Sequence, residues 1–379
     1  MYPSPAGIEF LESIIYGGRK DPLAKAVRAM LIALSGLYRA AIWVYLLPFE
    51  IGFRRQRKLD SPVVSVGNIT VGGTGKSPTV EYLCKGLLGQ NWKPAVLSYG
   101  YGGSLRGKFA VVSDGSSVSL APREAGDEPV MLATNVPGVP VLVCRDRVKS
   151  GRIAVGHFGA DILVLDDGFQ VWKVHRDLDI VLLNADNPLD NGRTLPAGRL
   201  REPLTALRRA DCIVATGIQA PREREDILTK VLRAAPTTPV YFGRFCPSVV
   251  ISLSYGSESP VERIRGKKVF ALSSIANPAS FEKTLTEAGA VIVGREALPD
   301  HHLYAAKDIA RINRGATEGN AELVVTTDKD AVKLDARQFT VPVMRLGIEL
   351  KLDDETGFWE FVARRIGRPP GPNKSRNAT

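Results

Sequence analysis

The sequence has few cysteines, and none of them is spaced for a metal site or a disulfide framework. The 379 residues include only four, which stand singly and without C-x-x-C spacing: Cys84, Cys144, Cys212 and Cys246. Small secreted domains depend on dense disulfides, and structural zinc sites depend on closely paired cysteines. Both classes are therefore excluded, and a reducing, cytoplasmic setting is predicted.

The sequence also lacks a continuous apolar run at its start, and it is short of negative charge. The first twenty positions are interrupted by Glu9, Glu12, Arg19 and Lys20, so we expect no cleavable signal peptide. Lysine and arginine number 50 against 40 aspartate and glutamate, which gives a net charge of +10. This balance favours a polyanionic partner: nucleic acid, an anionic membrane surface or a phosphorylated substrate.

One long apolar segment runs from Ala29 to Phe49, interrupted only by Ser35 and Arg39. As a helix it would reach about 30 Å, the thickness of a bilayer core. Basic residues flank it on both sides: Lys20, Lys25 and Arg28 before it, and Arg54, Arg55, Arg57 and Lys58 after it. Arg39 makes a simple span costly, so a spanning helix, a helix lying in the interface and a buried soluble helix all stay open. The basic flanks favour the membrane.

After this segment, short β-branched runs alternate with helical stretches, which is typical of a parallel sheet with helices on both faces. The first predicted strands are Pro62–Val66, Ala95–Ser98, Val139–Cys144, Ile162–Leu165, Ile180–Leu183 and Cys212–Ala215. Two extended runs, Val240–Phe245 and Val249–Ser254, lead to a second series at Lys268–Leu272, Val291–Val293 and Leu323–Thr326. The run Val341–Leu350 is predicted to pair near Val249 and form a two-stranded hinge.

The sequence SPVVSVGNITVGGTGKSPTVEYL predicts a strand, a glycine-rich loop and a helix that opens with Lys-Ser. The glycines allow successive N–H groups to face a phosphate, Lys76 can bridge the β- and γ-phosphates, and Ser77 can bind Mg²⁺. The predicted nucleotide-binding positions are Thr70, Val71, Gly72, Gly73, Thr74, Gly75, Lys76 and Ser77. Thr70 stands where the strict pattern has its first glycine, but the context favours ATP and Mg²⁺ over an ordinary turn.

A second motif, DILVLDDGFQ, delivers Asp166 and Asp167 at the carboxyl end of an apolar strand. Open α/β sheets bind ligands at this edge, and an aspartate there can hold Mg²⁺ directly or through water. Paired acids after a strand also cap helices, so this motif gains its weight from the glycine-rich loop upstream.

Several polar patches are candidates for substrate contacts. Asp127 in GDEP can take a proton from an alcohol, and basic side chains can grip phosphates: Arg145, Arg147, Lys149, Arg199 and Arg201. The sequence LPDHHLY brings His301 and His302 beside Asp300. Adjacent histidines on a regular strand face opposite sides, so a hydrogen-bonded catalytic histidine is favoured over a metal site. Each patch alone is also compatible with a solvated surface.

Taken in order, these motifs resemble the tetraacyldisaccharide 4'-kinase family of lipid A biosynthesis. The resemblance runs from about Pro62 to Leu334 and rests on VGNITVGGTGKSP, SYGYGG, GDEP, RDR, DDGFQ, LPAGRLREP, DHH and TTDKDAVKL. It implies transfer of the ATP γ-phosphate to the 4'-hydroxyl of a tetraacylated glucosamine disaccharide 1-phosphate. It also implies an enzyme at the cytoplasmic face of the inner membrane, whose partners are this lipid and an anionic membrane surface, and not nucleic acid.

The resemblance also implies roles for individual residues. Asp127 is expected to be the base with His301 as its partner, and Lys76 is the third catalytic residue. The implied metal set is Ser77, Asp166, Asp167 and Glu202, and the implied substrate-binding set is Arg145, Arg147, Gln170 and Arg201. The family usually has arginine at the position of Tyr99 and often histidine at that of Val171, so substrate contacts there are expected to differ.

We therefore predict an α/β fold: a P-loop, doubly wound, mostly parallel sheet, a second, smaller α/β domain and an N-terminal membrane-associated helix. The predicted divisions are a membrane-associated segment (1–60), a kinase domain (61–238), hinge strands (239–256), a smaller domain (257–338), a return strand with a terminal helix (339–366) and a disordered tail (367–379). Two alternatives are a membrane-attached P-loop GTPase or ATPase switch and a nucleic-acid-binding ATPase. The first needs an N-K-x-D segment, which TDKD at 327–330 imitates poorly.

Deletion of the residues before Ser61 is predicted to move the protein from the membrane fraction to the soluble fraction, because the apolar segment and its basic flanks are removed together. Cell fractionation of the truncated and full-length chains measures this. If the two chains fractionate alike, membrane association resides elsewhere in the molecule.

Overall fold

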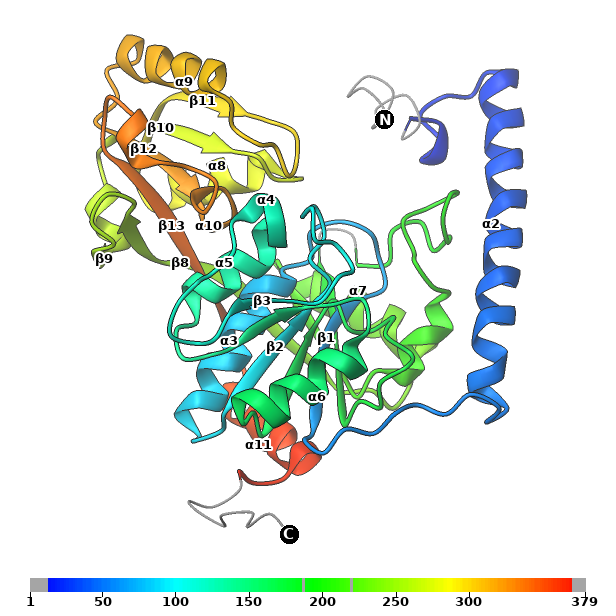
Figure 1. The fold of residues 1–379 in the computed structure, drawn as a ribbon. Coiled ribbons are helices and arrows are strands. Elements are labelled where there is room, and N and C mark those ends of the chain that lie inside the picture. Colours follow the sequence, from blue (N-terminus) through cyan, green and yellow to red (C-terminus); the bar gives the residue numbers. More distant parts are fainter. Residues whose placement is uncertain (1–12, 186–187, 219–220, 370–379) are drawn as a thin grey trace.

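The computed structural model describes residues 13–185, 188–218 and 221–369 (Figure 1). Its strands belong to one sheet in the order β11-β10-β12-β13-β8-β7-β6-β1-β5-β2-β4-β3, with β9 paired to β8. All neighbours along this order are parallel except β13 with β8 and β3 with β4. The predicted α/β class with a mostly parallel sheet is confirmed.

The first lobe carries strands that are buried on both faces, except for the partly buried edge strand β3. They are β1 (Val63–Asn68), β2 (Pro94–Ser98), β3 (Ala110–Ser113), β4 (Val141–Val143), β5 (Ile162–Asp166), β6 (Leu178–Asn184) and β7 (Cys212–Thr216). Its helices are α3 (Lys76–Gly89), α4 (Pro122–Ala125), α5 (Asp127–Asn135), α6 (Arg147–Phe158) and α7 (Pro221–Ala234), with α11 (Glu355–Ile366) added from the end of the chain. Val96 packs on the side of α3, α5 and α11, whereas Leu97 packs on the side of α6. The sheet is therefore covered on both faces, as parallel strands require.

The second lobe repeats this layering on a smaller scale. Its strands are β9 (Glu258–Pro260), β10 (Lys268–Ser273), β11 (Val291–Ala297) and β12 (Leu323–Thr327), and its helices are α8 (Pro278–Glu287), α9 (Ala306–Glu318) and α10 (Asp328–Ala331). Short 3₁₀ segments lie at Val261–Ile264 and Ala336–Gln338 in this lobe, and at Leu204–Arg209 in the first lobe. Helix α8 covers one face of the sheet through Phe281, and α9 covers the other through Ile312.

Two long strands connect the lobes, β8 (Val240–Ser252) and β13 (Val343–Leu352). They pair antiparallel, with Gly347 opposite Val249, so the predicted pairing is confirmed. The two runs expected at 240–245 and 249–254 form one strand, and its register shifts opposite Pro247. Proline has no N–H to give to the ladder, which accounts for the irregularity there.

Two strands were not predicted from the sequence. The edge strand β3 (Ala110–Ser113) has four residues and pairs antiparallel with β4, and β9 (Glu258–Pro260) has three. Both are too short to show the alternation of polar and apolar residues that marks a strand. Of the tail predicted to be disordered, residues 370–379 lie outside the described part of the chain.

The apolar N-terminal segment forms helix α2 (Pro22–Glu50), which runs along one side of the molecule (Figure 1). The carboxylate of Asp21 caps its start by accepting a hydrogen bond from Ala24 N. Its most apolar window has a mean hydropathy of 1.7, and only 17% of that window is buried. Leu37, Trp43 and Val44 are among its exposed large side chains. A helix buried in a soluble core is thereby disfavoured, and its association with a membrane stays a prediction.

A buried polar network joins the two lobes behind the hinge. Glu81 of α3 accepts a hydrogen bond from the Asn135 side chain of α5 (2.7 Å). The guanidinium of Arg345, on β13, donates to Asn135 and to Asp328 at the start of α10. Burial raises the pKa of Glu81 to about 7, because the bond from Asn135 only partly offsets the loss of water. Near neutral pH the folded protein therefore keeps a proton on Glu81 that the unfolded chain has released.

Glu81→Gln is predicted to stabilise the protein at alkaline pH and to leave it nearly unchanged at pH 4. Since the folded-state pKa lies above the ordinary value of 4.5, the free energy of unfolding falls as the pH rises from about 4.5 to about 7. The neutral amide removes this loss, which is about 3 kcal/mol, and can still accept from Asn135. Thermal unfolding of both proteins at pH 4 and pH 8 measures the effect. A variant equally stable to the wild type at pH 8 would contradict a buried, proton-holding Glu81.

Candidate active site

The glycine-rich loop lies between β1 and α3, as its sequence predicted. Gly72 and Gly75 have φ values of +114° and +79°, which side chains with a Cβ rarely adopt. A Cβ added to Gly75 would also lie 2.1 Å from the ring of Phe245, which belongs to the connecting strand β8. Around Gly73 nothing lies within 4 Å of a Cβ position, so that side of the loop is open.

Hydrogen bonds hold this loop from two sides. The Asn68 side chain donates to Thr74 Oγ1 (2.8 Å), and both residues are buried. Val71 N donates to the carbonyl of Arg199 (2.8 Å), and Thr70 forms a bridge with Leu200. Thr70 is thus paired with a neighbouring segment at the position where the strict motif has glycine.

The two acids after β5 lie in different electrostatic surroundings. Asp166 is 3% exposed and accepts a hydrogen bond from Ser98 Oγ (2.9 Å). Its Oδ1 has no hydrogen-bond partner among the described residues. Burial, together with the charges of Glu128 and Asp167, raises the pKa of Asp166 to about 6. A buried carboxylate oxygen with no protein donor fits a cation.

Asp167 contacts the lysine of the loop directly. Its carboxylate lies 3.8 Å from Lys76 Nζ and 2.8 Å from a guanidinium nitrogen of Arg201. Burial opposes ionisation, but these two cations outweigh it and lower the pKa of Asp167. The residue has φ +52°, a strained conformation for a non-glycine residue and one that recurs at functional sites. The structure thus brings three predicted site residues together: Lys76, Asp167 and Arg201.

Glu202 and Gln170 lie beside this group. Gln170 Nε2 donates to Glu202 (3.1 Å), and the guanidinium of Arg209 donates to both Glu202 oxygens (2.8 and 3.1 Å). Arg209 in turn lies over the rings of Phe169 and Trp172. Because both oxygens of Glu202 already accept from protein donors, its geometry favours support of Gln170 over metal ligation. No group of three or more acidic, histidine or cysteine residues arranged for a metal occurs within residues 13–185, 188–218 and 221–369.

Asp127 and His301 meet across the two lobes. Nδ1 of His301 lies 2.9 and 3.0 Å from the two oxygens of Asp127. Asp127 is the first residue of α5, whose N-cap is Gly126, and it is 5% exposed. Burial opposes its ionisation, but the hydrogen bond from His301 and the charges of Lys329 and Lys333 outweigh burial and lower the pKa of Asp127. This carboxylate is therefore ionised at neutral pH.

The two arginines of CRDRVKSG lie in different environments. Arg145 is exposed, whereas Arg147 is 5% exposed and donates to the Cys144 carbonyl. Two guanidinium groups lie over the ring of Tyr99, that of Arg147 at 5.7 Å and that of Arg106 at 5.3 Å. Burial lowers the pKa of Arg147, and its Nε has no hydrogen-bond partner within the described residues. A buried guanidinium in this state favours an anionic ligand.

The chain that carries these site residues matches the model of a known protein family. The model for LpxK, tetraacyldisaccharide-1-P 4'-kinase, matches residues 27–367. The chain belongs to this family. It is therefore an enzyme, a kinase of the tetraacyldisaccharide 4'-kinase family.

Individual relatives agree with the family match. The tetraacyldisaccharide 4'-kinase of Syntrophus aciditrophicus is 41% identical and is aligned over 91% of this chain and 94% of its own length. That of Geobacter metallireducens is also 41% identical, over 86% and 93%. Among solved structures, LpxK from Aquifex aeolicus in complex with ATP matches with a TM-score of 0.73 and 31% identity, covering 90% of this chain and 99% of that one.

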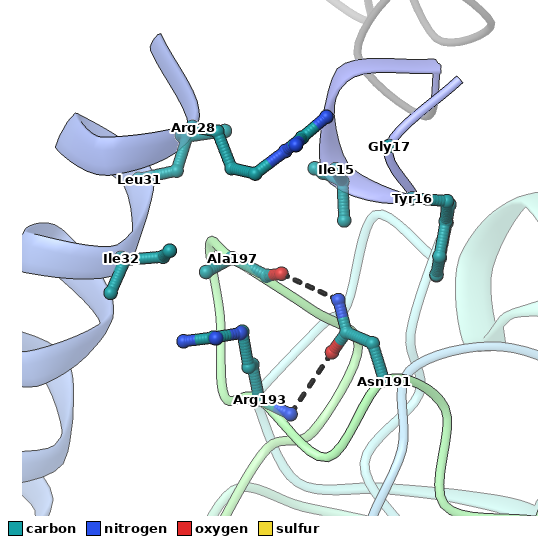
Figure 2. A pocket seen from close by; sticks show the side chains of 9 residues that line it. All are labelled: Ile15, Tyr16, Gly17, Arg28, Leu31, Ile32, Asn191, Arg193 and Ala197. Carbon is teal, nitrogen blue, oxygen red and sulfur yellow. Dashed lines mark hydrogen bonds between the residues drawn. The ribbon is translucent and has the colours of Figure 1, made fainter. Parts of the chain in front are cut away.

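In this member of the 4'-kinase family, two adjoining cavities lie between α2 and the loop around residues 191–205. The first, of about 240 Å³, is shown in Figure 2, where Arg28 from α2 and Arg193 from the loop approach it from opposite sides. Asn191 shapes the loop by accepting from Arg193 N (3.0 Å) and donating to the Ala197 carbonyl (2.8 Å). The second, of about 600 Å³, adds Arg39 to the lining. Arg39, which the sequence presented as a cost to membrane insertion, thus lines a cavity.

Several residues near the kinase site were not found from the sequence. Arg106 stacks on Tyr99 and on Tyr101, whose ring lies 5.6 Å from that of His301. Lys333 lies 3.7 Å from Asp127 and is 3% exposed. The sequence TTDKDAVKL gave a signal for Lys333 only through the family resemblance, and Arg106 gave none beyond its charge.

Proposed function

We propose that this enzyme transfers the γ-phosphate of ATP to the 4'-hydroxyl of a tetraacylated glucosamine disaccharide 1-phosphate. The products are ADP and the 4'-phosphorylated lipid. The observation that carries this proposal is the contact between Asp127 and His301, beside the sheet edge that bears the phosphate loop and the paired acids. The charge of Glu128, which follows Asp127, acts on Asp166. The Asp127–His301 pair and the paired acids after β5 therefore share one electrostatic environment. The names of the relatives and the ATP complex of the Aquifex aeolicus protein support the substrate pair.

In this proposal the loop from Thr70 to Ser77 binds ATP. Backbone N–H groups around Gly73 face the phosphates, and Lys76 contacts the transferred phosphoryl group. The Ser77 hydroxyl and the acids after β5 would hold Mg²⁺, and the unpartnered oxygen of Asp166 supports this assignment. When bound, Mg²⁺ offsets the charge on the phosphates. Arg201, which contacts Asp167 in the structure, moves partly away from it and contacts the phosphates or the acceptor.

Asp127 is the base of the proposed reaction. Its carboxylate accepts the proton of the 4'-hydroxyl as the hydroxyl oxygen forms its bond to the γ-phosphorus, and the bond from that phosphorus to the bridging oxygen breaks to release ADP. The lowered pKa keeps Asp127 ionised and ready for this proton. His301 orients the carboxylate through the hydrogen bond from Nδ1. The pair is already in contact, so its formation needs no further closure of the lobes.

The acceptor needs contacts to its sugars, its phosphate and its acyl chains. We propose that Arg145, Arg147, Arg201 and Gln170 bind the polar part. The cavities beside α2 carry Arg28, Arg39 and Arg193, and this basic lining supports an anionic head group near the helix.

We further propose that α2 docks the enzyme on the cytoplasmic face of the inner membrane. Leu37, Trp43 and Val44 are 68%, 57% and 61% exposed on it, and an acylated substrate is itself held in the bilayer. The basic flanks of the helix suit anionic lipid head groups.

The alternative of a nucleotide switch has no structural support within the described residues. The acids of TDKD, which a switch would need for reading guanine, are bound by protein groups: Asp328 by Arg345, and Asp330 by Ser274. This segment lies in the second lobe, after β12. The kinase is therefore the function that the geometry supports best.

The proposed function is tested by phosphoryl transfer from γ-labelled ATP to a tetraacyl disaccharide 1-phosphate in detergent micelles. We expect label in the lipid, acid-stable and at the 4' position by mass spectrometry of the fragmented product. The same disaccharide already phosphorylated at 4' is the control acceptor and should take no label. Labelled inorganic phosphate without labelled lipid would instead indicate a simple ATPase.

Lys76→Ala is predicted to lower kcat/KM at least 100-fold, because the transferred phosphoryl group loses its cation. Lys85→Ala is the matched control, since Lys85 lies on the same helix, is largely exposed and is far along it from the loop. Steady-state kinetics and thermal unfolding of both variants separate chemistry from folding. Equal activities in the two variants would refute the role of Lys76.

Asp127→Ala is predicted to lower turnover by about 10² to 10⁴-fold with ATP binding nearly unchanged, and His301→Ala to lower it less. The double variant should be little worse than Asp127→Ala, because the histidine acts only through the carboxylate. His302→Ala is the matched control, since His302 bonds to Asp308 within its own lobe. Turnover of all four variants decides the point, and fully multiplicative losses would mean that Asp127 and His301 act independently.

A further inference from the structure

Lys329, in the segment TTDKD, lies directly behind the catalytic pair. It is the second residue of α10, and its Nζ is 3.3 Å from Nε2 of His301, on the side of the imidazole away from Asp127. The same ammonium lies 2.8 Å from Asp300 Oδ1 and 3.5 Å from Glu128 Oε1. Its side chain is only 16% exposed. One cation therefore contacts the histidine, the acid beside it and an acid of the first lobe.

The donors and acceptors around His301 specify its proton. An ammonium group can only donate, so Nε2 facing Lys329 must accept. An ionised carboxylate can only accept, so Nδ1 facing Asp127 must donate. These two contacts together fit a neutral imidazole with its proton on Nδ1. The imidazolium would turn an N–H toward Lys329 at 3.3 Å, whereas Asp300 Oδ2 lies 3.8 Å from Nε2, beyond hydrogen-bond distance.

We propose that Lys329 is a positioning residue for the phosphoryl transfer: it favours the neutral form of His301 with the proton on Nδ1, and so leaves Asp127 able to accept the substrate proton. The part that concerns phosphoryl transfer rests on the proposed function. A neutral imidazole orients the carboxylate without adding a full positive charge beside it, and an imidazolium would weaken Asp127 as a base.

The charges that face His301 explain why such a device is needed. Asp127 from α5 and Asp300 from its own segment both favour the imidazolium, and the ring of Tyr101 adds no charge. Lys329 contacts the imidazole and opposes both acids. Lys333, also in the second lobe, faces Asp127 instead. The hydrogen bond to Asp127 raises the pKa of His301 overall, and the charge of Lys329 limits that rise.

The nearby acids keep this lysine charged. Burial alone would lower the pKa of Lys329, but Glu128, Asp127 and Asp300 outweigh it and raise the pKa. The backbone of His301 has φ +61° and its N–H donates to Asp300 (3.0 Å), so the ring is fixed from the main chain as well. The imidazole is thus held from both ring nitrogens and from its backbone.

Nuclear magnetic resonance of ¹⁵N-histidine in the full-length enzyme tests the proposal without relying on turnover. The chain has only four histidines, and His301→Ala identifies the resonances of His301. In the wild type, above the pKa of His301, we expect the ¹⁵N shifts of the form protonated on Nδ1. In Lys329→Met, we expect the protonation constant of His301 to rise about tenfold, which is one pH unit. Lys329→Arg should restore most of the wild-type value.

Kinetics then connect this state to catalysis. The acid limb of the pH dependence of kcat/KM should move upward by the same amount in Lys329→Met, with a loss that approaches tenfold well below the pKa of His301 and shrinks toward pH 9. Lys267→Met is the matched control, since Lys267 pairs with Glu322 on the exposed surface of the same lobe. The resonances of the other histidines report that each variant is folded.

A wild-type His301 protonated on Nε2, or a protonation constant unchanged in Lys329→Met, would overturn the proposal. So would a uniform loss of turnover at every pH, which a merely structural lysine would cause. An enzyme that labels no disaccharide lipid would refute the proposed function instead, and the titration would still decide the state of His301.

Discussion

The hydrogen bond between Asp127 and His301 constrains the rest of the structure, because its two residues belong to different lobes. A separation of 2.9 Å can be kept only if the lobes are fixed relative to each other. The antiparallel pairing of β8 with β13 meets this need, since each strand also pairs with the sheet of one lobe and makes the two sheets continuous. Phe245 of β8 packs against Gly75, so the same connection reaches the phosphate loop.

The site concentrates buried charge, and the surrounding structure offsets its cost with specific partners. Asp127, Asp166 and Arg147 are each 5% exposed or less, a degree of burial that strongly disfavours isolated ions. Asp127 meets this cost through His301 and Lys333, whereas Asp166 keeps an oxygen without a donor and a raised pKa. The difference separates the carboxylate that we propose as the base from an acid whose surroundings suit a cation.

The sequence was sufficient for features that local patterns encode. The β-branched runs predicted most strands, and the glycine-rich loop was found from its glycines, from Lys76 and Ser77, and from the strand and helix patterns on either side. It was insufficient where the interacting residues are distant in sequence. The residues around Arg106 look like those around any surface arginine, and only the fold brings Arg106 over Tyr101. The hydrogen bonding of Glu202 by Arg209 likewise depends on the fold, although the two residues are near in sequence. The proposed acceptor was inferred from the family resemblance, since no spacing of residues encodes a lipid.

The segment around residues 194–201 relates the apolar helix to the phosphate loop. Ser35 of α2 is hydrogen-bonded to Thr194, and the Tyr38 hydroxyl donates to the Arg201 carbonyl (3.0 Å). The same segment pairs with the loop, because Arg201 N donates to the Ile69 carbonyl (2.7 Å) and the next pairing joins Leu200 to Thr70. Only one short segment therefore separates the exposed apolar helix from the backbone that would contact a nucleotide. A lipid held beside α2 and a phosphate held by the loop would be positioned by the same residues, which is the geometry that transfer between a membrane substrate and a soluble nucleotide requires.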